Sequence, residues 1–296
     1  MRNKLPRVRF YALLPQPKAA TMQCMNARRR TPSRRLSMLL GLLLFLDSPR
    51  PLMAEPTRAA VAAFNAYCKS VEARLAQQHR SPASFLALAA DRTQQEARLR
   101  TGELVIDQLT PSTPTEFPGA LLHHWRGTAF APGATAADFE RLMRDFHSYP
   151  QHFSPQVLEA TTLSQDGDHQ QAWMRVRQHH VITIVMDTTY DITYNHLDPR
   201  HGYSISHSTR IDEVEAPGTP NEHILSPTEE HGFLWRLNTY WSYEERDGGL
   251  YLQVEAVSLT RSIPRGLGWA IGPFVESVPR ESLEFTLRSA CNALRK

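Results

Sequence analysis

Residues 130–155 read FAPGATAADFERLMRDFHSYPQHFSP, and this stretch decides the fold class. Its first residues complete an expected strand that begins at Leu121. Thr135 and Asp138 then form a capping box with a short acid, which is typical of a helix N-terminus. The apolar face of that helix is formed by Phe139, Leu142, Met143 and Phe146. Tyr149-Pro150 ends it, so the sequence predicts a strand followed by a pair of short helices.

The strand before this stretch, LLHHWRGTAFAPG over residues 121–133, raises the question of a metal site because His123 and His124 are adjacent. Neighbouring residues of a strand point to opposite faces, so the two imidazoles are not expected to bind one metal ion, and one of them is expected to face solvent. The same holds for His179 and His180. No HExxH motif or helical i, i+4 histidine pair occurs in the sequence, so no metal site is predicted.

After the short helices the sequence predicts strands only. They are expected at 157–164 and 171–179, joined at Gly167, and then at 182–194 and 203–212. In the third of these, Ile184, Met186, Tyr190, Ile192 and Tyr194 alternate with polar residues, so this face is expected to be buried. In the fourth, His207 shares a face with Tyr203, Ile205, Thr209 and Ile211, so we expect His207 to point inward.

Asp247-Gly248 predicts a two-residue hairpin between the last two strands, which pairs Arg246 with Gly249. This register sorts the side chains into an apolar, inward face and a polar face. The polar face holds Arg236, Asn238, Gln253 and Glu255. The inward face holds Phe233, Trp235, Leu237, Thr239, Trp241 and Tyr243 with Leu252, Val254, Ala256 and Ser258.

The C-terminal region reads IPRGLGWAIGPFVESVPRESLEFTLRSACNAL over residues 263–294. Its glycines and Pro273 predict a loose apolar segment around Leu267, Trp269, Ile271 and Phe274. A firmer helix is expected after Pro279, and its apolar stripe is formed by Leu283, Leu287, Ala290 and Leu294.

The order of elements over residues 121–296, carried chiefly by the 130–155 and 263–294 stretches, resembles the START and Bet v 1-like helix-grip superfamily, including its polyketide-cyclase and coenzyme-Q-binding branches. This resemblance implies an α+β fold in which a curved antiparallel sheet of about seven strands grips the C-terminal helix around an apolar cavity. The kinked Gly and Pro entry to the last helix departs from the plain helix of the family and predicts a mobile lid there. Neither stretch is a catalytic signature.

The N-terminal region has the parts of an export signal. Residues 1–54 hold eleven Lys and Arg against one acid, and the apolar run MLLGLLLFL spans residues 38–46. Nine residues are too few to span a membrane, so we expect cleavage after Ala54 and a periplasmic or secreted protein. The remaining chain carries twenty-two basic and twenty-nine acidic residues, which disfavours nucleic-acid binding.

Between the leader and the main domain, residues 57–78 predict a helix because Val61, Phe64, Cys68, Val71 and Leu75 recur at helical spacing. A short strand is expected at 103–109, and the Pro- and Thr-rich stretch 110–118 is interpreted as a linker. The predicted domains are therefore a signal peptide at 1–54, a helical extension at 55–118 and the START/Bet v 1-like domain at 119–296. Cys68 and Cys291 are interpreted as buried small side chains, with a disulfide as the alternative.

The function hypothesis follows from the inward aromatic residues and the absence of catalytic motifs. We expect an exported protein that binds or transfers a hydrophobic, lipid-like or quinone-like molecule, with transient membrane contact and without a cofactor. The expected ligand-binding residues are Tyr190, Tyr194, His207, Trp235, Trp241, Val254 and Trp269. For each of these, filling of the core is the competing interpretation, and for His207 it is a satisfied core imidazole. Two alternatives stay open: a cyclase- or dehydratase-like enzyme, since separated catalytic residues leave no motif, and a docking module of the cell envelope.

Overall fold

The structure is a computed structural model that describes residues 55–88, 91–110, 117–179, 183–262 and 268–295, with side chains from 277 onward in the last range. The predicted signal peptide lies outside these residues. The described residues, from 55 to 295, belong to one compact unit. The segment interpreted as an extension therefore packs as part of the same unit as the sheet.

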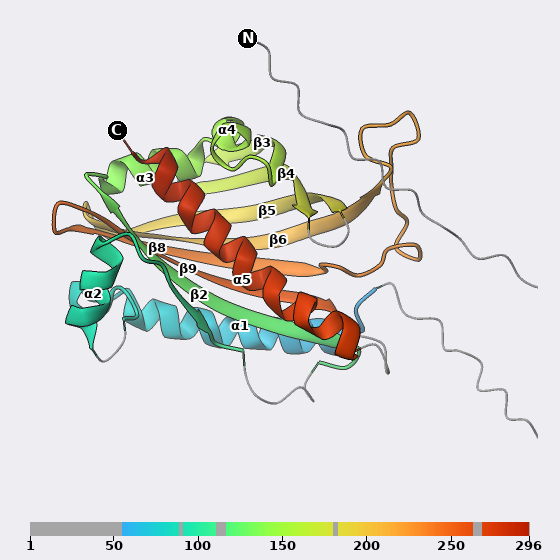
Figure 1. Cartoon of the computed structure of the whole chain (residues 1–296), viewed down its shortest axis with the longest axis horizontal. Helices are drawn as coiled ribbons and strands as arrows, with labels where there is room; N and C mark the ends of the chain where they lie inside the picture. Colours follow the sequence, from blue (N-terminus) through green and yellow to red (C-terminus); the bar gives the residue numbers. More distant parts are fainter. Residues whose placement is uncertain (1–54, 89–90, 111–116, 180–182, 263–267, 296) are drawn as a thin grey trace, which may run out of the picture. The chain divides into compact units, whose positions relative to one another are not determined.

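Within the described residues the strands form one open, antiparallel, nine-stranded sheet with the order β1-β2-β9-β8-β6-β5-β4-β3, and β7 pairs with β6 (Figure 1). The predicted order of strand, two short helices, six main strands and a long C-terminal helix is confirmed. The bounds are β1 Val105–Gln108, β2 Ala120–Pro132, β3 Val157–Asp166, β4 His169–His179, β5 Thr183–Asp198, β6 His201–Glu215, β7 His223–Ile224, β8 Arg236–Arg246 and β9 Gly249–Arg261.

The hairpin between β8 and β9 has the predicted register. Arg246 pairs with Gly249, and Trp241 pairs with Val254. Asp247 and Gly248 both have positive φ angles, of 57° and 73°, which is the conformation of the primed turns that Asp-Gly favours. The turn chemistry therefore sets which side chains of the last two strands share a face.

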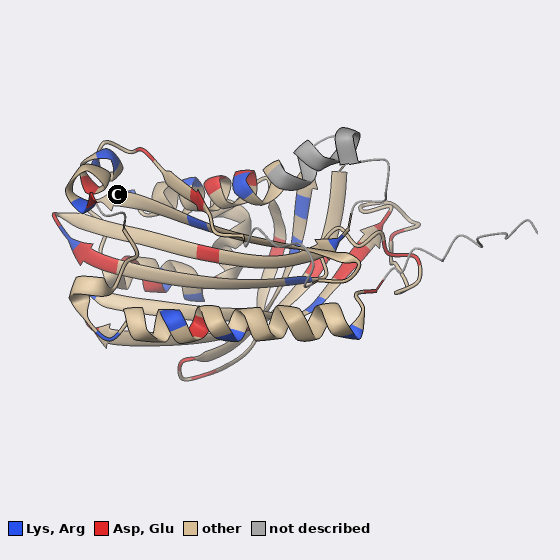
Figure 2. Ribbon diagram, turned by 90° about the horizontal axis from the view of Figure 1, so that it is seen from below, with Lys and Arg blue, Asp and Glu red and all other residues tan. Residues whose placement is uncertain are grey.

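The long helix α5 spans Gly268–Ala293 and crosses one face of the sheet, whereas α1, Arg58–Gln78, lies on the opposite face (Figures 1 and 2). The backbone is helical from Gly268 onward. The expectation of a loose, non-helical segment before Pro279 is therefore wrong for the backbone of these residues. Leu283 and Leu287 of α5 contact the sheet at Gly127, where an added Cβ would lie 2.5 Å from the Leu287 Cδ1 atom. A glycine at this position lets the helix approach the strand closely.

The expected capping box is present. The Thr135 side chain accepts from the Asp138 backbone N–H, and the Asp138 carboxylate accepts from Thr135, at the start of α3, Ala136–Arg144. A 3-10 turn, Phe146–Ser148, continues into α4, Tyr149–His152, so Tyr149-Pro150 begins a helical turn instead of ending the helix. Pro150 is tolerated there because the first turn of a helix needs no backbone donor.

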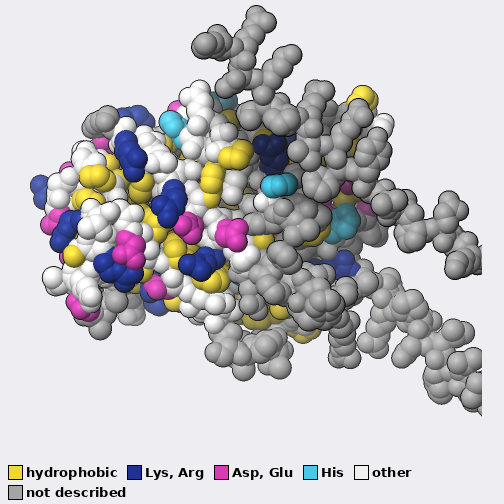
Figure 3. All heavy atoms as spheres, viewed as in Figure 1, with side chains coloured by type: hydrophobic (Ala, Val, Ile, Leu, Met, Phe, Trp, Pro, Cys, Tyr) yellow, Lys and Arg dark blue, Asp and Glu magenta, His cyan; other side chains and the backbone are white. Residues whose placement is uncertain are grey.

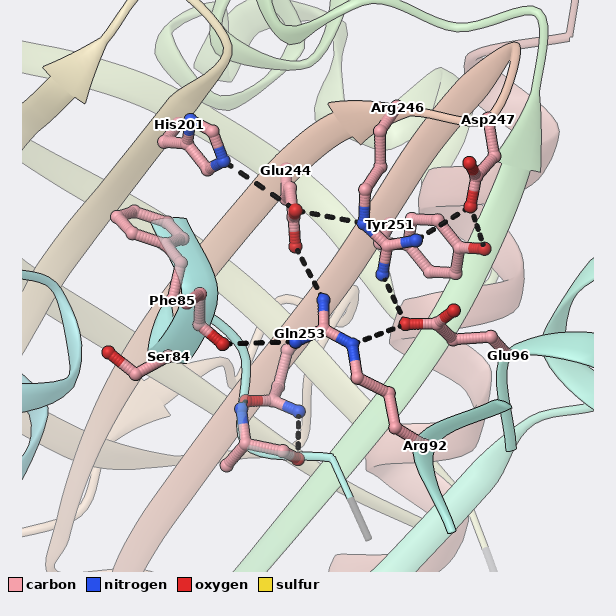
Figure 4. A network of polar contacts seen from close by, with 12 residues as sticks. Ser84, Phe85, Arg92, Glu96, His201, Glu244, Arg246, Asp247, Tyr251 and Gln253 are labelled. Carbon is pink, nitrogen blue, oxygen red and sulfur yellow. Dashed lines mark hydrogen bonds and ion pairs between the residues drawn. The ribbon is translucent and has the colours of Figure 1, made fainter. Parts of the chain in front are cut away.

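The helix α2, Arg92–Arg100, follows the short 3-10 turn Pro82–Ser84 and is tied to the β8–β9 hairpin by charged side chains (Figure 4). Arg246 donates to Glu96 of α2 at 2.7 Å and to Glu244 at 2.8 Å. Gln253 of β9 exchanges two hydrogen bonds, each of 2.9 Å, with the backbone of Ala87. These contacts bury polar side chains of β8 and β9 that the sequence alone places on an outward face.

Among the described residues, no helix has the length and hydropathy that a membrane crossing requires. Both described cysteines are free thiols. Cys68 lies in the cluster between α1 and the sheet, and Cys291 packs with the cluster under α5. The alternative of a disulfide between them is therefore wrong, because the sheet separates the two thiols.

Candidate functional site

The candidate ligand site is the middle of the sheet face that α5 covers. Two rows of cross-strand neighbours lie there, and each row runs from β2 through β9, β8 and β6 to β5. The first row is Trp125, Ala256, Thr239, Ser206 and Ile192, and the second is His123, Ser258, Leu237, Ser208 and Tyr190. We call these ten residues the central rows.

Small side chains dominate the central rows on the three middle strands. Five of the six positions on β9, β8 and β6 are Ala, Ser or Thr, with Leu237 as the sixth. Ala256, Thr239, Leu237 and Ser208 remain partly accessible although they lie at the centre of the sheet. In the next row toward the hairpin, by contrast, Val254 and Trp241 are 2% and 5% exposed. These four positions are therefore more accessible than the adjacent row.

Trp125 provides an unused hydrogen-bond donor at the edge of the central rows. Its side chain is buried in the cluster under α5, and among the described residues its indole N–H has no hydrogen-bond partner. A buried donor without a partner costs about 1–3 kcal/mol. A ligand oxygen that accepts from this N–H would remove that cost.

His123 is the imidazole of the central rows. Its Nε2 atom lies 3.2 Å from the Thr260 hydroxyl oxygen. Burial lowers the pKa of His123 to about 4, so the imidazole is neutral at physiological pH. It can therefore donate or accept one hydrogen bond without placing a charge beside an apolar ligand.

Four of the sequence-predicted ligand residues lie on the α5 face as expected, namely Tyr190, Tyr194, Trp241 and Val254. The Tyr194 hydroxyl donates toward the Met143 carbonyl at 3.0 Å and the Gln170 amide oxygen at 2.9 Å. The Trp241 ring meets the Phe139 ring edge-on at 5.2 Å between centroids. Protein groups thus hold Tyr194 and Trp241. Tyr190 is the predicted residue that lies within the central rows, beside their partly accessible positions.

His207 does not point inward. Its Nε2 atom lies 2.8 Å from the Glu72 carboxylate of α1, on the opposite face of the sheet, and its side chain is 45% exposed. The serines of β6 occupy the α5 face instead, as the pairing of Ser208 with Tyr190 shows. The prediction failed because it assumed that the apolar side of β6 must face the cavity. On the other face, α1 covers Ile205, and Phe85 of the segment after α1 packs with Tyr203.

Trp235 is also on the α1 side, in the cluster that holds Phe64, Val71 and Leu259. It precedes the first residue of β8, so the alternation of the strand does not fix its direction. The side chain of Trp269, like the expected lid around it, lies outside the described residues. The structure therefore brings together Tyr190, Trp241 and Val254 and separates His207 and Trp235 from them.

His123 and His124 do face opposite sides of β2, but both are buried, with exposures of 6% and 3%. The expectation that one faces solvent is wrong because α1 covers the back of the sheet and contacts His124. Within the described ranges, no group of three or more His, Cys, Asp and Glu side chains is arranged to hold a metal ion. The prediction of no metal stays a prediction.

The sequence hypothesis missed Trp125, Ala256, Thr239 and Ser258 as site residues. The sequence did carry one signal, which is the face that these residues share. Trp125 lies two residues from His123 and so points to the same side of the strand, and Ala256 and Ser258 are on the predicted inward face. Small side chains give no further signal in a sequence because they carry little chemistry of their own.

No protein-family model matches the chain, and no curated protein matches it. Among solved structures, a protein of Thermus thermophilus is similar at a TM-score of 0.42 and 11% identity, over 57% of this chain and 94% of that one. A STAR-related lipid transfer protein of Xanthomonas axonopodis is similar at a TM-score of 0.38 and 15% identity, over 62% of this chain and 98% of that one. The Zhui aromatase/cyclase of a Streptomyces species is similar at a TM-score of 0.37 and 13% identity, over 58% of this chain and 93% of that one.

These neighbours include START-domain proteins and aromatase/cyclases, the groups that the sequence resembles. Their identities and TM-scores are too low to assign an activity to this chain. The START/Bet v 1-like helix-grip fold rests on the topology of the chain itself, an open antiparallel sheet with α5 packed across one face.

Proposed function

We propose that this protein binds a hydrophobic ligand, lipid-like or quinone-like, between the central rows of the sheet and α5. The observation that carries the proposal is the indole N–H of Trp125, which lacks a partner among the described residues, beside a patch of small, partly accessible side chains. Pockets for small molecules are mostly apolar with a few placed polar groups, and this face has that character. The ligand has an oxygen acceptor, such as a carbonyl, that meets the Trp125 N–H.

The energetics limit the size of the ligand. Burial of each CH₂ contributes roughly 0.8 kcal/mol, so a dozen methylenes contribute about 10 kcal/mol. Association costs about 4 to 15 kcal/mol in lost freedom. A long-chain or multi-ring molecule therefore remains bound through purification, and a small polar metabolite does not.

The outer surface supports an enclosed site. On the side that carries α5, charged side chains of both signs are interspersed with hydrophobic ones (Figure 3). The large hydrophobic side chains that are exposed, Leu163, Leu197, Ile224 and Phe233, lie on β3, on β5, on β7 and in the segment before β8, respectively. The apolar surface suited to a ligand is the covered face of the sheet.

In the alternative of a docking module, the N-terminal helix α1 binds a partner, and the apolar stripe of α1 bears on this alternative. That stripe, with Phe64, Cys68, Val71 and Leu75, packs against Tyr240, Val257 and Leu259 of the sheet. It is therefore used within the chain. This observation favours ligand binding over docking through α1.

The first test is native mass spectrometry of the protein purified from its own host, followed by titration with fluorescent fatty-acid and quinone analogues. We expect Trp125→Phe to weaken binding about 5- to 30-fold, equivalent to about 1–2 kcal/mol for one lost hydrogen bond. Ala256→Leu should abolish binding by filling the central rows. Trp235→Phe is the matched control on the other face and should leave binding unchanged. Absence of any bound or titrated apolar molecule, or equal binding by all three variants, would overturn the proposal.

We also propose that the protein is exported and collects its ligand through transient contact with a membrane. The basic leader and the short apolar run at 38–46 support export. N-terminal sequencing of the cell-envelope or medium fraction should find a chain that begins at or near Glu55. A chain that keeps residues 38–46 in a membrane fraction would contradict this.

A further inference from the structure

A pocket of about 480 Å³ lies between α1 and the back of the sheet, on the face opposite to α5. The side chains around it come from α1, from β2 and from the segments next to them. They include Tyr67, Arg74, Gln78, Leu109, His124 and Arg126. This pocket is separate from the central rows, because the sheet lies between them.

At this pocket, Tyr67, His124 and Glu255 form a hydrogen-bonded relay. The Tyr67 hydroxyl lies 2.8 Å from His124 Nδ1, and His124 Nε2 lies 2.9 Å from the Glu255 carboxylate. A carboxylate only accepts, so Nε2 carries the hydrogen, and in the tautomer with that hydrogen alone Nδ1 accepts from the Tyr67 hydroxyl. A hydroxyl, a base and a group that orients the base are thus in line, which is the arrangement that activates nucleophiles in enzymes.

Charges hold the relay in this state. Burial alone would raise the pKa of Glu255, but hydrogen bonds from His124 and Arg74 outweigh it, and the pKa stays below its ordinary value. Glu255 is therefore a carboxylate at neutral pH. Burial raises the pKa of Tyr67, so the phenol is protonated and needs His124 as a base.

Unsatisfied polar atoms point to a missing partner at the same place. Among the described residues, Arg126 Nε and Glu255 Oε1 are buried without a hydrogen bond, and Arg126 NH1 lies 3.9 Å from that carboxylate oxygen. The Glu255 side chain is only 2% exposed. Buried polar groups in proteins normally have partners, so two such atoms beside one relay are unusual. Arg126 lines the pocket, and its guanidinium charge favours a negatively charged oxygen that develops there in a reaction.

We propose that this pocket is an acyl-transfer site in which Tyr67 is the nucleophile toward esters with a good leaving group, such as aryl esters and thioesters. The Tyr67 oxygen attacks the carbonyl carbon while its proton passes to His124 Nδ1. The bond to the leaving alcohol or thiol breaks, and His124 returns the proton to that group. Water then attacks the Tyr67 ester with His124 as base, which releases the carboxylic acid and restores the phenol.

Glu255 is a positioning residue in this scheme. It fixes the imidazole with Nδ1 toward Tyr67 and stabilises the imidazolium that forms during proton transfer. Arg74 pairs with the same carboxylate and keeps it charged. The same contacts also hold α1 on the sheet. A substitution in the relay can therefore act by loosening α1, so the test needs a measurement that does not depend on the packing of α1.

The test uses the purified full chain with para-nitrophenyl acetate as the probe. We expect release of para-nitrophenolate above the buffer rate and an acetyl adduct on Tyr67 in peptide mass spectra. Tyr67→Phe should abolish the adduct. His124→Gln should reduce the rate by about 10²- to 10⁴-fold, the usual contribution of a positioned base. Glu255→Gln should change the pH profile of the rate as well as its size.

Tyr240→Phe is the control, because Tyr240 lies on the same face, as the cross-strand neighbour of Glu255, while its hydroxyl bonds to Glu72 at 3.0 Å and, within the described residues, to no member of the relay. It should keep both the rate and the adduct. Circular dichroism confirms that Tyr67→Phe is folded before its rate is compared. Release at the buffer rate, an adduct only on other residues, or an unchanged rate in Tyr67→Phe would overturn the proposal. Because the central rows lie on the other face, these outcomes are independent of apolar ligand binding.

Discussion

His124 and Glu255 form a buried pair between β2 and β9, with 2.9 Å between Nε2 and the carboxylate and side-chain exposures of 3% and 2%. Both belong to strands whose other face packs under α5. The pair is shielded from water by α1, which adds Tyr67 and Arg74 to it. At this pair the back of the sheet is therefore a buried, polar layer that borders the pocket beside α1.

Breaking this pair should cost stability. We expect His124→Leu to lower the free energy of unfolding by about 3 kcal/mol, since removal of one partner from a buried pair leaves the other poorly compensated. His207→Leu is the matched control, because the His207 pair with Glu72 is half-exposed and should lose under about 1 kcal/mol. Urea unfolding followed by circular dichroism measures both. Equal losses would show that burial of the His124 pair adds nothing.

Acid should destabilise the protein through His123. Its pKa is about 4 in the folded chain, because of burial, against about 6.5 when unfolded. The unfolded state therefore binds the proton more tightly, so the contribution of His123 to stability is full above pH of about 6.5 and is lost as pH falls toward about 4. Between pH 7 and 5 this loss should amount to about 2 kcal/mol.

The check is the difference in unfolding free energy between the two pH values, compared in wild type and His123→Gln. The variant should lose about 2 kcal/mol less on acidification. His79, whose pKa burial also lowers to about 4, remains in both proteins and accounts for part of the remaining slope. Identical slopes would contradict the neutral, buried state of His123.

The close approach of α5 to β2 should depend on Gly127. An added methyl would lie 2.5 Å from Leu287 Cδ1 and 3.1 Å from Leu283 Cδ2, so Gly127→Ala should lower stability by about 1–3 kcal/mol through overpacking. Leu287→Ala removes the nearer atom and should itself cost about 2–5 kcal/mol. In the double variant the loss should be smaller than the sum of the two single losses, because both act at one contact. Strict additivity in thermal or urea unfolding would show that the helix moves away freely.

The two described thiols should be unreactive in the native protein. Burial raises the pKa of Cys68 and of Cys291 to about 11, so little thiolate is present at neutral pH. Iodoacetamide labelling followed by peptide mass mapping should find both unmodified when native and both modified in urea without reductant. Rapid native labelling of Cys68 would mean that α1 leaves the sheet readily, and failure to label both in urea would indicate a disulfide.

Local chemistry determined several features of this protein from sequence alone. Thr135 and Asp138 cap α3, and Asp247-Gly248 sets the β8–β9 register, because caps and tight turns depend on a few adjacent residues. The apolar spacing of Phe64, Cys68, Val71 and Leu75 predicts α1 and its buried stripe. The order of these elements was enough to indicate the helix-grip fold.

Only the tertiary structure decided which face β6 presents to α5. A pattern of apolar residues marks the buried side of a strand only when the other side meets water, and here α1 and α2 cover that other side. This is why the prediction for His207 put it on the wrong face, whereas Trp235 precedes β8 and strand alternation does not set its direction. For the same reason Gln253 and Glu255, at 2% and 1% exposure, are buried although the sequence predicts an outward, polar face for them.

The two sites could not be predicted from the sequence for a related reason. At the central rows, the small side chains Ala256, Thr239 and Ser258 come from neighbouring strands, and pairing across the sheet sets their closeness. The relay joins Tyr67 of α1 to His124 and Glu255 of two strands, residues that are far apart along the chain. Sequence determined the elements through local interactions, and packing of α1 and α5 on opposite faces decided which side chains meet.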